Sequence, residues 1–234
     1  MSASGRGLIR SALIIFARLP QPGRAKTRLA AALGDDFAAD FYRRCAEHVL
    51  HQTAPLAPTA ARYLFHDAAK DAASIIRWLG PYLHYGPQTE GDLGERMASA
   101  FHHVFAAGAN SALIIGTDIP DISTDILAAA YAALNSYDVV IGPAGDGGYY
   151  LLGINELYVE LFKDIAWSTR RVLVQTLSVT EKLGLSVHRL PMLMDIDTAA
   201  DLRRWALATS TMPASLRELL NTLPPGILPQ PRSG

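Results

Sequence analysis

The apolar stretch at residues 112–122, ALIIGTDIPDI, constrains the possible folds more than any other part of the sequence. Its first four residues are aliphatic, and Pro120 comes soon after them. Such a run is typical of a strand buried on both faces of a parallel sheet. In open α/β sheets, ligands bind beyond the carboxyl ends of the strands, which predicts that Asp118 meets a ligand or a metal ion. The alternative is that Asp118 or Asp121 caps a helix that begins near Ser123.

Segments with the periodicity of strands and of helices alternate along the rest of the chain. The expected strands are 12–16, 62–65, 138–141, 149–152 and 185–190, together with the run before Asp118. The expected helices are 37–49, 72–79, 97–105, 126–134, one capped by Ser168 or Thr169 that runs to 177, and one after Thr198. This alternation predicts an α/β protein with three layers, α/β/α, around a mixed, mostly parallel sheet.

Composition limits the classes of protein to which the chain can belong. The sequence has 234 residues, a formal net charge of -1 and one cysteine. A near-neutral chain has no long-range field for nucleic acid or an anionic membrane, and one cysteine excludes a disulfide within the chain. The apolar run near the N-terminus is too short for a signal peptide or a membrane span, so a cytoplasmic location is expected. The length favours one domain, residues 1–222, followed by a proline-rich, irregular tail, residues 223–234.

The loop after the first expected strand is basic. It contains Arg18, Arg24, Lys26 and Arg28, together with two prolines and a glycine. Lysine binds phosphate as a point charge and arginine as a bidentate fork, so Lys26 and Arg28 are candidate phosphate ligands. The loop lacks the leading glycine of a Walker A motif, which excludes a P-loop NTPase. The alternative interpretation is a solvated basic loop.

A second acidic segment, Asp195-Ile196-Asp197-Thr198, precedes the last expected helix. Thr198 and Asp201 have the spacing of a capping box. That role leaves Asp195 and Asp197 unexplained, and both are suitable ligands for a hard cation opposite Asp118. The same letters match the DxDxT nucleophile motif of haloacid-dehalogenase-like phosphatases, but too little chain follows to build such a domain.

Six motifs, in order, resemble the bacterial DUF2064 family. They are FARLPQPGRAKTRL, QTEGDLGERM, GTDIP, GPAGDGGYYLLG, WST and DIDTAADL. Members of that family are described as glycosyltransferases of the GT-A, or nucleotide-diphospho-sugar transferase, fold, and one branch is associated with arsenosugar biosynthesis. The motifs are more distantly similar to those of phospholactate guanylyltransferases and molybdenum-cofactor nucleotidyltransferases.

The resemblance implies roles for individual residues. Lys26, Arg28 and Arg18 would bind the phosphates of a nucleotide, and Gln88, Gly91 and Asp92 would lie near its base or ribose. Asp118 and Asp197 would bind Mg²⁺ or Mn²⁺, with Asp195 in support. Asp146, Gly147, Gly148, Trp167, Ser168 and Thr169 would face the acceptor, and Asp146 is the candidate general base.

The function expected from the resemblance is metal-dependent glycosyl transfer from a nucleotide sugar. One alternative is a nucleotidyltransferase that releases pyrophosphate from a nucleoside triphosphate, and another is a nucleotide-binding module without activity. Both enzymes would stabilise the charge of a leaving phosphate with the same cations. The expected partners are a nucleotide sugar or nucleoside triphosphate and a small-molecule acceptor, and neither nucleic acid nor a membrane.

Overall fold

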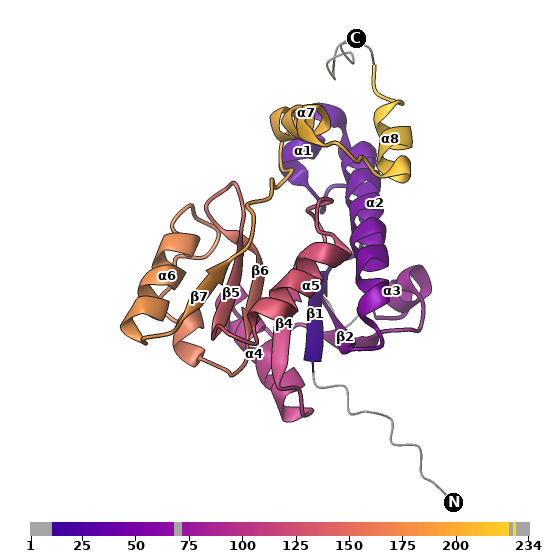
Figure 1. The fold of residues 1–234 in the computed structure, drawn as a ribbon. Coiled ribbons are helices and arrows are strands. Elements are labelled where there is room, and N and C mark those ends of the chain that lie inside the picture. Colours follow the sequence, from indigo (N-terminus) through magenta and orange to yellow (C-terminus); the bar gives the residue numbers. More distant parts are fainter. Residues whose placement is uncertain (1–10, 68–71, 225–226, 228–234) are drawn as a thin grey trace, which may run out of the picture.

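The computed structural model describes residues 11–67, 72–224 and 227, and within them strands and helices alternate (Figure 1). The strands are β1 (Ser11–Ala17), β2 (Ala60–His66), β3 (His84–Pro87), β4 (Ser111–Ile115), β5 (Val139–Pro143), β6 (Tyr149–Ile154) and β7 (Val187–Arg189). The helices are α1 (Thr27–Leu33), α2 (Asp35–Thr53), α3 (Ala72–Leu79), α4 (Leu93–Ala106), α5 (Thr124–Ala133), α6 (Val172–Lys182), α7 (Ala199–Ala208) and α8 (Ala214–Leu220). Two short 3-10 helices, η1 (Ala54–Leu56) and η3 (Val159–Phe162), lie in connections.

The strands form a seven-stranded sheet in the order β3-β2-β1-β4-β6-β5-β7. β1 pairs in parallel with both β2 and β4, and β5 pairs in parallel with β7. β6 lies between β4 and β5 and is antiparallel to both. From β1 the sheet extends through β2 and β3 on one side and through β4 on the other. The topological switch point therefore lies between β1 and β4, and α/β sheets bind ligands at such points. The predicted mixed, mostly parallel sheet is confirmed.

Helices cover both faces of the sheet because the side chains of each strand alternate between two cores. Leu13 and Ile15 of β1 join α2, α3 and α5 in one core, whereas Ile14 joins α4 and α6 in the other. A strand buried on both faces must be apolar at every position, which explains the continuous runs in β1 and β4. The expected three layers are thus confirmed.

A third apolar cluster lies beyond the sheet, and in it the first two helices of the chain pack against the last two. It contains Leu29 of α1, Phe41 and Cys45 of α2, Trp205 of α7 and Leu216 of α8. Figure 1 shows α1, α7 and α8 grouped at the top of the molecule. This cluster brings the basic loop before α1 to the acidic segment before α7. Burial raises the pKa of the Cys45 thiol, as expected for a core residue.

The observed elements differ from the expected ones mainly where they are short. α1, β3 and α8 are additional, and α6 begins at Val172 rather than after Ser168 or Thr169. The helix after Asp118 is capped by Ser123, whose hydroxyl accepts from the Ile126 amide, so neither Asp118 nor Asp121 is the cap. The expected N-terminal boundary of the domain and most of the expected tail lie outside the described residues. None of the described helices is long and apolar enough to cross a bilayer.

Candidate functional site

A cavity of about 520 Å³ opens at the carboxyl ends of β1 and β4. Its floor includes Phe16 and Ala17 at the end of β1 and Ile114 and Ile115 at the end of β4. Other lining residues are Arg18, Arg24, Lys26, Arg28, Tyr42, Gln88, Arg96, Thr117, Asp118, Tyr149, Tyr150, Ser168 and Asp197. Five of these side chains are cationic, so the cavity is suited to an anion.

The basic loop turns tightly before it enters α1. The amides of Arg24 and Ala25 both donate to the carbonyl oxygen of Gln21, at 3.1 and 3.2 Å. Gly23 has a φ of 74°, which favours glycine, and Lys26 has a φ of 48°, which is rare for a residue with a Cβ. Ala25 is buried, so the loop is anchored between its exposed arginines.

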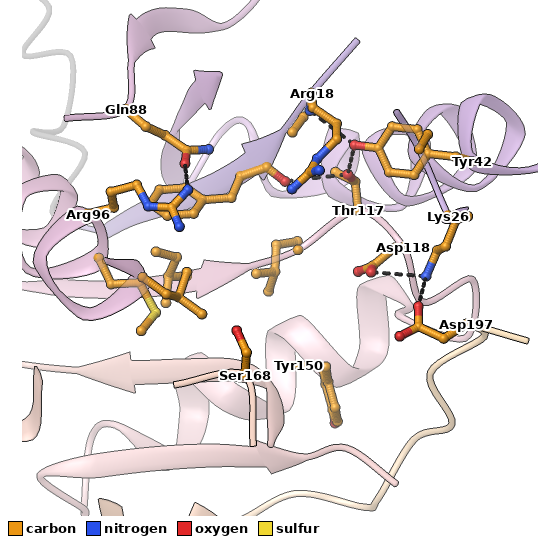
Figure 2. A pocket seen from close by; sticks show the side chains of 18 of the residues that line it. Arg18, Lys26, Tyr42, Gln88, Arg96, Thr117, Asp118, Tyr150, Ser168 and Asp197 are labelled. Carbon is orange, nitrogen blue, oxygen red and sulfur yellow. Dashed lines mark hydrogen bonds and ion pairs between the residues drawn. The ribbon is translucent and has the colours of Figure 1, made fainter. Parts of the chain in front are cut away.

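Lys26 joins the two acidic segments at one end of the cavity (Figure 2). Its Nζ donates to Asp118 Oδ2 at 3.1 Å and to Asp197 Oδ1 at 3.0 Å. The Lys26 side chain is 4% exposed, whereas those of Asp118 and Asp197 are 48% and 43% exposed. This shared contact brings Asp118 and Asp197 together, and their role as metal ligands stays a prediction.

The charges of this cluster stabilise one another. Burial of the Lys26 ammonium opposes its charged form, but the carboxylates of Asp118 and Asp197 outweigh that effect and raise the pKa of Lys26. The Lys26 ammonium in turn lowers the pKa of Asp118. Lys26 and Asp118 are therefore both charged at neutral pH.

Tyr42 of α2 connects the basic loop to the loop after β4. Its hydroxyl accepts from the Arg18 amide at 3.0 Å and lies 2.9 Å from Thr117 Oγ1. Thr117 Oγ1 also donates to the Phe16 carbonyl oxygen at 3.4 Å. These contacts hold Arg18 and Thr117 at the same edge of the sheet, and Asp118 directly follows Thr117.

Gln88 and Arg96 lie at the other end of the cavity from Lys26 (Figure 2). Arg96 Nη1 donates to Gln88 Oε1 at 3.1 Å, and Arg96 Nε donates to the Asp92 carbonyl oxygen at 3.2 Å. Gln88 Nε2 donates to the Phe65 carbonyl oxygen at 3.1 Å, which orients its amide. Two of the five N–H groups of the Arg96 guanidinium are used in these contacts.

Gly91 and Asp92, which were expected near a base or ribose, do not line the cavity. Asp92 is the N-cap of α4 and forms a capping box with Glu95. Gly91 has a φ of 112°, and a Cβ there would lie 2.2 Å from a carboxylate oxygen of Glu95. In this structure both residues shape the start of α4, and their contact to a nucleotide stays a prediction.

The glycine-rich loop packs against the turn before α6. A Cβ on Gly147 would lie 2.5 Å from the Arg170 carbonyl oxygen, so the two backbones touch. Asp146 Oδ1 accepts from the Gly148 amide at 2.8 Å. Asp146, Gly147 and Gly148 do not line the cavity, although Tyr149 directly after them does, and their role toward an acceptor stays a prediction.

Asp195 lies with the glycine-rich loop and not with Lys26. A Cβ on Gly145 would be 3.5 Å from Asp195 Oδ1. Burial and the nearby charge of Asp146 raise the pKa of Asp195. Within the described ranges, no three acidic, histidine or cysteine side chains form a group that could hold a metal. The structure therefore brings together Asp118 and Asp197 but not the expected third carboxylate.

The three residues of the WST motif have different surroundings. Ser168 has a φ of 62° and lines the cavity on the wall opposite Arg18 (Figure 2). The Trp167 indole packs on the start of α4, where a Cβ on Gly94 would lie 2.5 Å from Trp167 Nε1. Thr169 Oγ1 donates to the Ala166 carbonyl oxygen at 2.7 Å and is not the cap of α6, whose N-cap is Arg171.

Three residues of the site were missed by sequence reasoning. Tyr42 has the position of a core residue in α2, Arg96 resembles a solvated residue in the first turn of α4, and Tyr150 belongs to a strand. The signal that could have identified Arg96 is its place in the GDLGERM motif, four residues after Asp92.

Comparison with known proteins identifies the family. The model of the family described as "Uncharacterized protein conserved in bacteria (DUF2064)" matches residues 50–169, which is more than half of the chain. The chain belongs to the DUF2064 family. None of the curated proteins matches the sequence.

The solved structures that resemble this DUF2064 protein share its fold. One, a "putative nucleotide-diphospho-sugar transferase" from Desulfovibrio desulfuricans G20, has 33% identity and a TM-score of 0.86, over 92% of this chain and 95% of that one. A 4-diphosphocytidyl-2C-methyl-D-erythritol synthase from Anaerococcus prevotii DSM 20548 has 12% identity and a TM-score of 0.53, over 82% and 94%. Rv0371c from Mycobacterium tuberculosis H37Rv, in complex with manganese, has 14% identity and a TM-score of 0.51, over 85% and 98%. The predicted nucleotide-diphospho-sugar transferase type of fold is confirmed.

Proposed function

We propose that this protein is a metal-dependent glycosyltransferase that uses a nucleotide-sugar donor. The observation that carries the proposal is the contact of Lys26 with both Asp118 and Asp197, at one end of a cavity lined by arginines. The relative with 33% identity, named as a nucleotide-diphospho-sugar transferase, supports the choice of donor.

The donor set at this end of the cavity fits a divalent cation. Asp118 and Asp197 turn oxygens toward one point, and both side chains are about half exposed, so an ion can reach them. Carboxylate oxygens are the ligands that Mg²⁺ and Mn²⁺ prefer. When bound, such an ion would neutralise charge on the phosphates of the leaving nucleotide. Asp195 is a supporting residue in this proposal rather than a direct ligand.

The cations of the basic loop would act on the leaving group. In glycosyl transfer the bond from sugar C1 to the phosphate oxygen breaks, a bond from C1 to an acceptor oxygen forms, and a nucleoside diphosphate leaves. Lys26, Arg18 and Arg28 would stabilise the negative charge that develops on this diphosphate. The acceptor proton must go to a base, and Asp146 is our candidate because it is exposed in the loop that leads into Tyr149, which lines the cavity.

The other end of the cavity would accept the nucleoside. Arg96 and the oriented amide of Gln88 offer polar groups, and Leu93 and Met97 provide an apolar surface beside them. A planar base needs both kinds of contact. Gln88 and Arg96 lie at one end of the cavity and Lys26 at the other, an arrangement that suits a ligand with a base at one end and phosphates at the other (Figure 2).

Nucleotidyl transfer is the second candidate, since a cytidylyl-transferring synthase has the same fold. In that reaction an acceptor oxygen attacks the α-phosphorus of a nucleoside triphosphate, and pyrophosphate leaves. The same cations would stabilise pyrophosphate. A nucleotide-binding module without activity is the third, and it would bind a nucleotide without turnover.

Thermal shifts separate these candidates. The protein is heated with nucleotide sugars, nucleoside diphosphates or nucleoside triphosphates, each with and without Mg²⁺ or Mn²⁺. A ligand at about 100 times its Kd stabilises by roughly 2.7 kcal/mol, which raises the Tm of a chain of this size by about 5 to 11 °C. A metal-dependent shift that is largest with one nucleotide sugar supports glycosyl transfer. A shift with one triphosphate and none with sugars would replace it by nucleotidyl transfer.

A further inference from the structure

The ammonium of Lys26 occupies the point toward which the two carboxylates turn. It bonds Asp118 and Asp197 at 3.1 and 3.0 Å and is almost fully buried, while both carboxylates remain about half exposed. An ion that approaches these oxygens from the cavity therefore meets a positive charge already bound to them. Among the described residues, Lys26 is the cation that hydrogen-bonds both carboxylates.

The backbone of Lys26 does not favour this position. Its φ of 48° and ψ of 50° are left-handed, a conformation that costs energy for any residue with a Cβ. The residue begins α1 without a capping hydrogen bond from its side chain. The two ion pairs hold the buried Lys26 side chain in place, and we expect it to leave them only for another strong acceptor.

We propose that Lys26 makes the carboxylate pair selective for a divalent ion that arrives with the phosphates of a nucleotide, over the free ion. This inference rests on the proposed function. A free ion would have to break both contacts of Lys26 and leave a buried ammonium beside another cation, which is unfavourable. Phosphate oxygens supply a new acceptor for Lys26, so the ion and the phosphates bind with positive coupling.

The inference predicts opposite effects of one substitution on two ligands. Lys26→Met removes the competing charge, so it should strengthen the binding of Mn²⁺ alone. The same variant loses a phosphate ligand, so pyrophosphate should no longer increase the binding of Mn²⁺. A residue that served only as a phosphate ligand, or only as a structural counter-ion, would not give this pair of effects.

The test is equilibrium dialysis of the full chain against Mn²⁺, with and without inorganic pyrophosphate. Lys26→Gly serves as a second variant, because glycine accepts a φ of 48° and removes the same ammonium if Lys26→Met is unstable. Arg24→Met is the matched control, since Arg24 is an exposed cation of the same loop that lines the cavity, and its guanidinium hydrogen-bonds the Gln21 side chain rather than either carboxylate. Circular dichroism checks the fold of each variant.

We expect both Lys26 variants to bind Mn²⁺ alone at least about tenfold more tightly than the wild type, the factor that one charge-assisted hydrogen bond provides. Arg24→Met should bind Mn²⁺ alone as the wild type does, and pyrophosphate should increase the Mn²⁺ bound to the wild type. Lys26 variants that bind no more tightly than the wild type, or a wild type unaffected by pyrophosphate, overturn the inference. The thermal shifts with nucleotide sugars decide the proposed function separately, because they need no Lys26 variant.

Discussion

Asp118 and Asp197 share one buried lysine, so a change at either carboxylate alters the environment of the other. Asp118→Asn removes one of the two charged partners of Lys26. We expect the free energy of unfolding to fall by about 1 to 3 kcal/mol, the cost of weakening a charged hydrogen bond to a buried group. If Asp118 is a metal ligand, turnover should also fall by about 10²- to 10³-fold.

Urea unfolding and steady-state rates measure these two effects of Asp118→Asn. Asp125→Asn is the matched control, because Asp125 is exposed in the first turn of α5 and lies away from the cavity. Full activity in Asp118→Asn would exclude the metal assignment. An unchanged stability would show that the ion pair with Lys26 contributes little to the fold.

Arg96 is the residue on which the proposed base end of the cavity depends. Arg96→Met retains much of the side-chain length but removes the donors, so nucleotide affinity should fall about tenfold, or roughly 1.4 kcal/mol. Calorimetric titration with the nucleotide that gives the largest thermal shift measures this change. Arg77→Met, at an exposed position of α3, should bind as the wild type does. Equal affinities in the two variants would place the base elsewhere.

Single residues differ in how far the sequence predicts them. Asp118 and the loop that holds Lys26 each follow an apolar strand, so their place at the carboxyl edge of the sheet could be predicted. Asp197 precedes α7 and was expected there only as a second carboxylate suited to a cation. Arg96 could not be predicted, since an arginine in a first helical turn is usually solvated. Its place in the cavity depends on the pairing of β3 with β2, which brings Gln88 beside the start of α4.

Helix α2 positions the site through Tyr42, a polar side chain on its mostly apolar buried face. Tyr42→Phe removes the acceptor of the Arg18 amide and the partner of Thr117. Because these groups are buried or partly buried, we expect a loss of about 1 to 3 kcal/mol in the free energy of unfolding. A double-mutant cycle with Thr117→Val, followed by urea denaturation, measures the coupling between the two side chains.

In that cycle, additive effects of Tyr42→Phe and Thr117→Val would mean that the two hydroxyls do not interact. A coupling of at least about 0.5 kcal/mol would support the contact. We also expect weaker nucleotide binding in Tyr42→Phe, since Arg18 is positioned by this network.

Helices and strands were predicted best where their hydrophobic pattern extends over many residues. The periodic face of α2 and the continuous apolar runs of β1 and β4 are clear in the sequence, because burial on a stripe or on both faces requires them. The helices α1 and α8 have seven residues each, too few for a periodicity to emerge. The start of α6 was misplaced because Ser168 and Thr169 resemble caps but form the preceding turn.

At the scale of the whole molecule, the site is made where distant parts of the chain meet. The third apolar cluster joins α1 and α2 to α7 and α8, and this brings Lys26 to Asp197 across 171 positions of sequence. The insertion of β6 between β4 and β5 follows from no local pattern, because an antiparallel and a parallel strand buried on both faces have the same composition. Strand order was therefore beyond prediction, although the class of sheet was not.

The acidic segment before α7 also meets the glycine-rich loop, and this contact should make the stability of the whole protein depend on pH. Burial and the charge of Asp146 raise the pKa of Asp195 in the folded protein. The folded state thus binds a proton at Asp195 more tightly than the unfolded state does, so the contribution of Asp195 to stability increases as pH falls through its raised pKa. At neutral pH the ionised carboxylate is destabilising.

Asp195→Asn should therefore raise the free energy of unfolding at pH 7, and its advantage over the wild type should vanish once the pH is below the ordinary pKa of an aspartate. Asp138→Asn should do the opposite, because hydrogen bonds from Ser186 lower the pKa of Asp138 and its stabilising effect is present above the ordinary pKa and lost in acid. Urea unfolding of the three proteins between pH 3 and 7 compares them. Parallel curves for Asp195→Asn and the wild type would mean that burial and the charge of Asp146 do not raise the pKa of Asp195. The proposal that Asp195 supports the cation site would then lose its electrostatic basis.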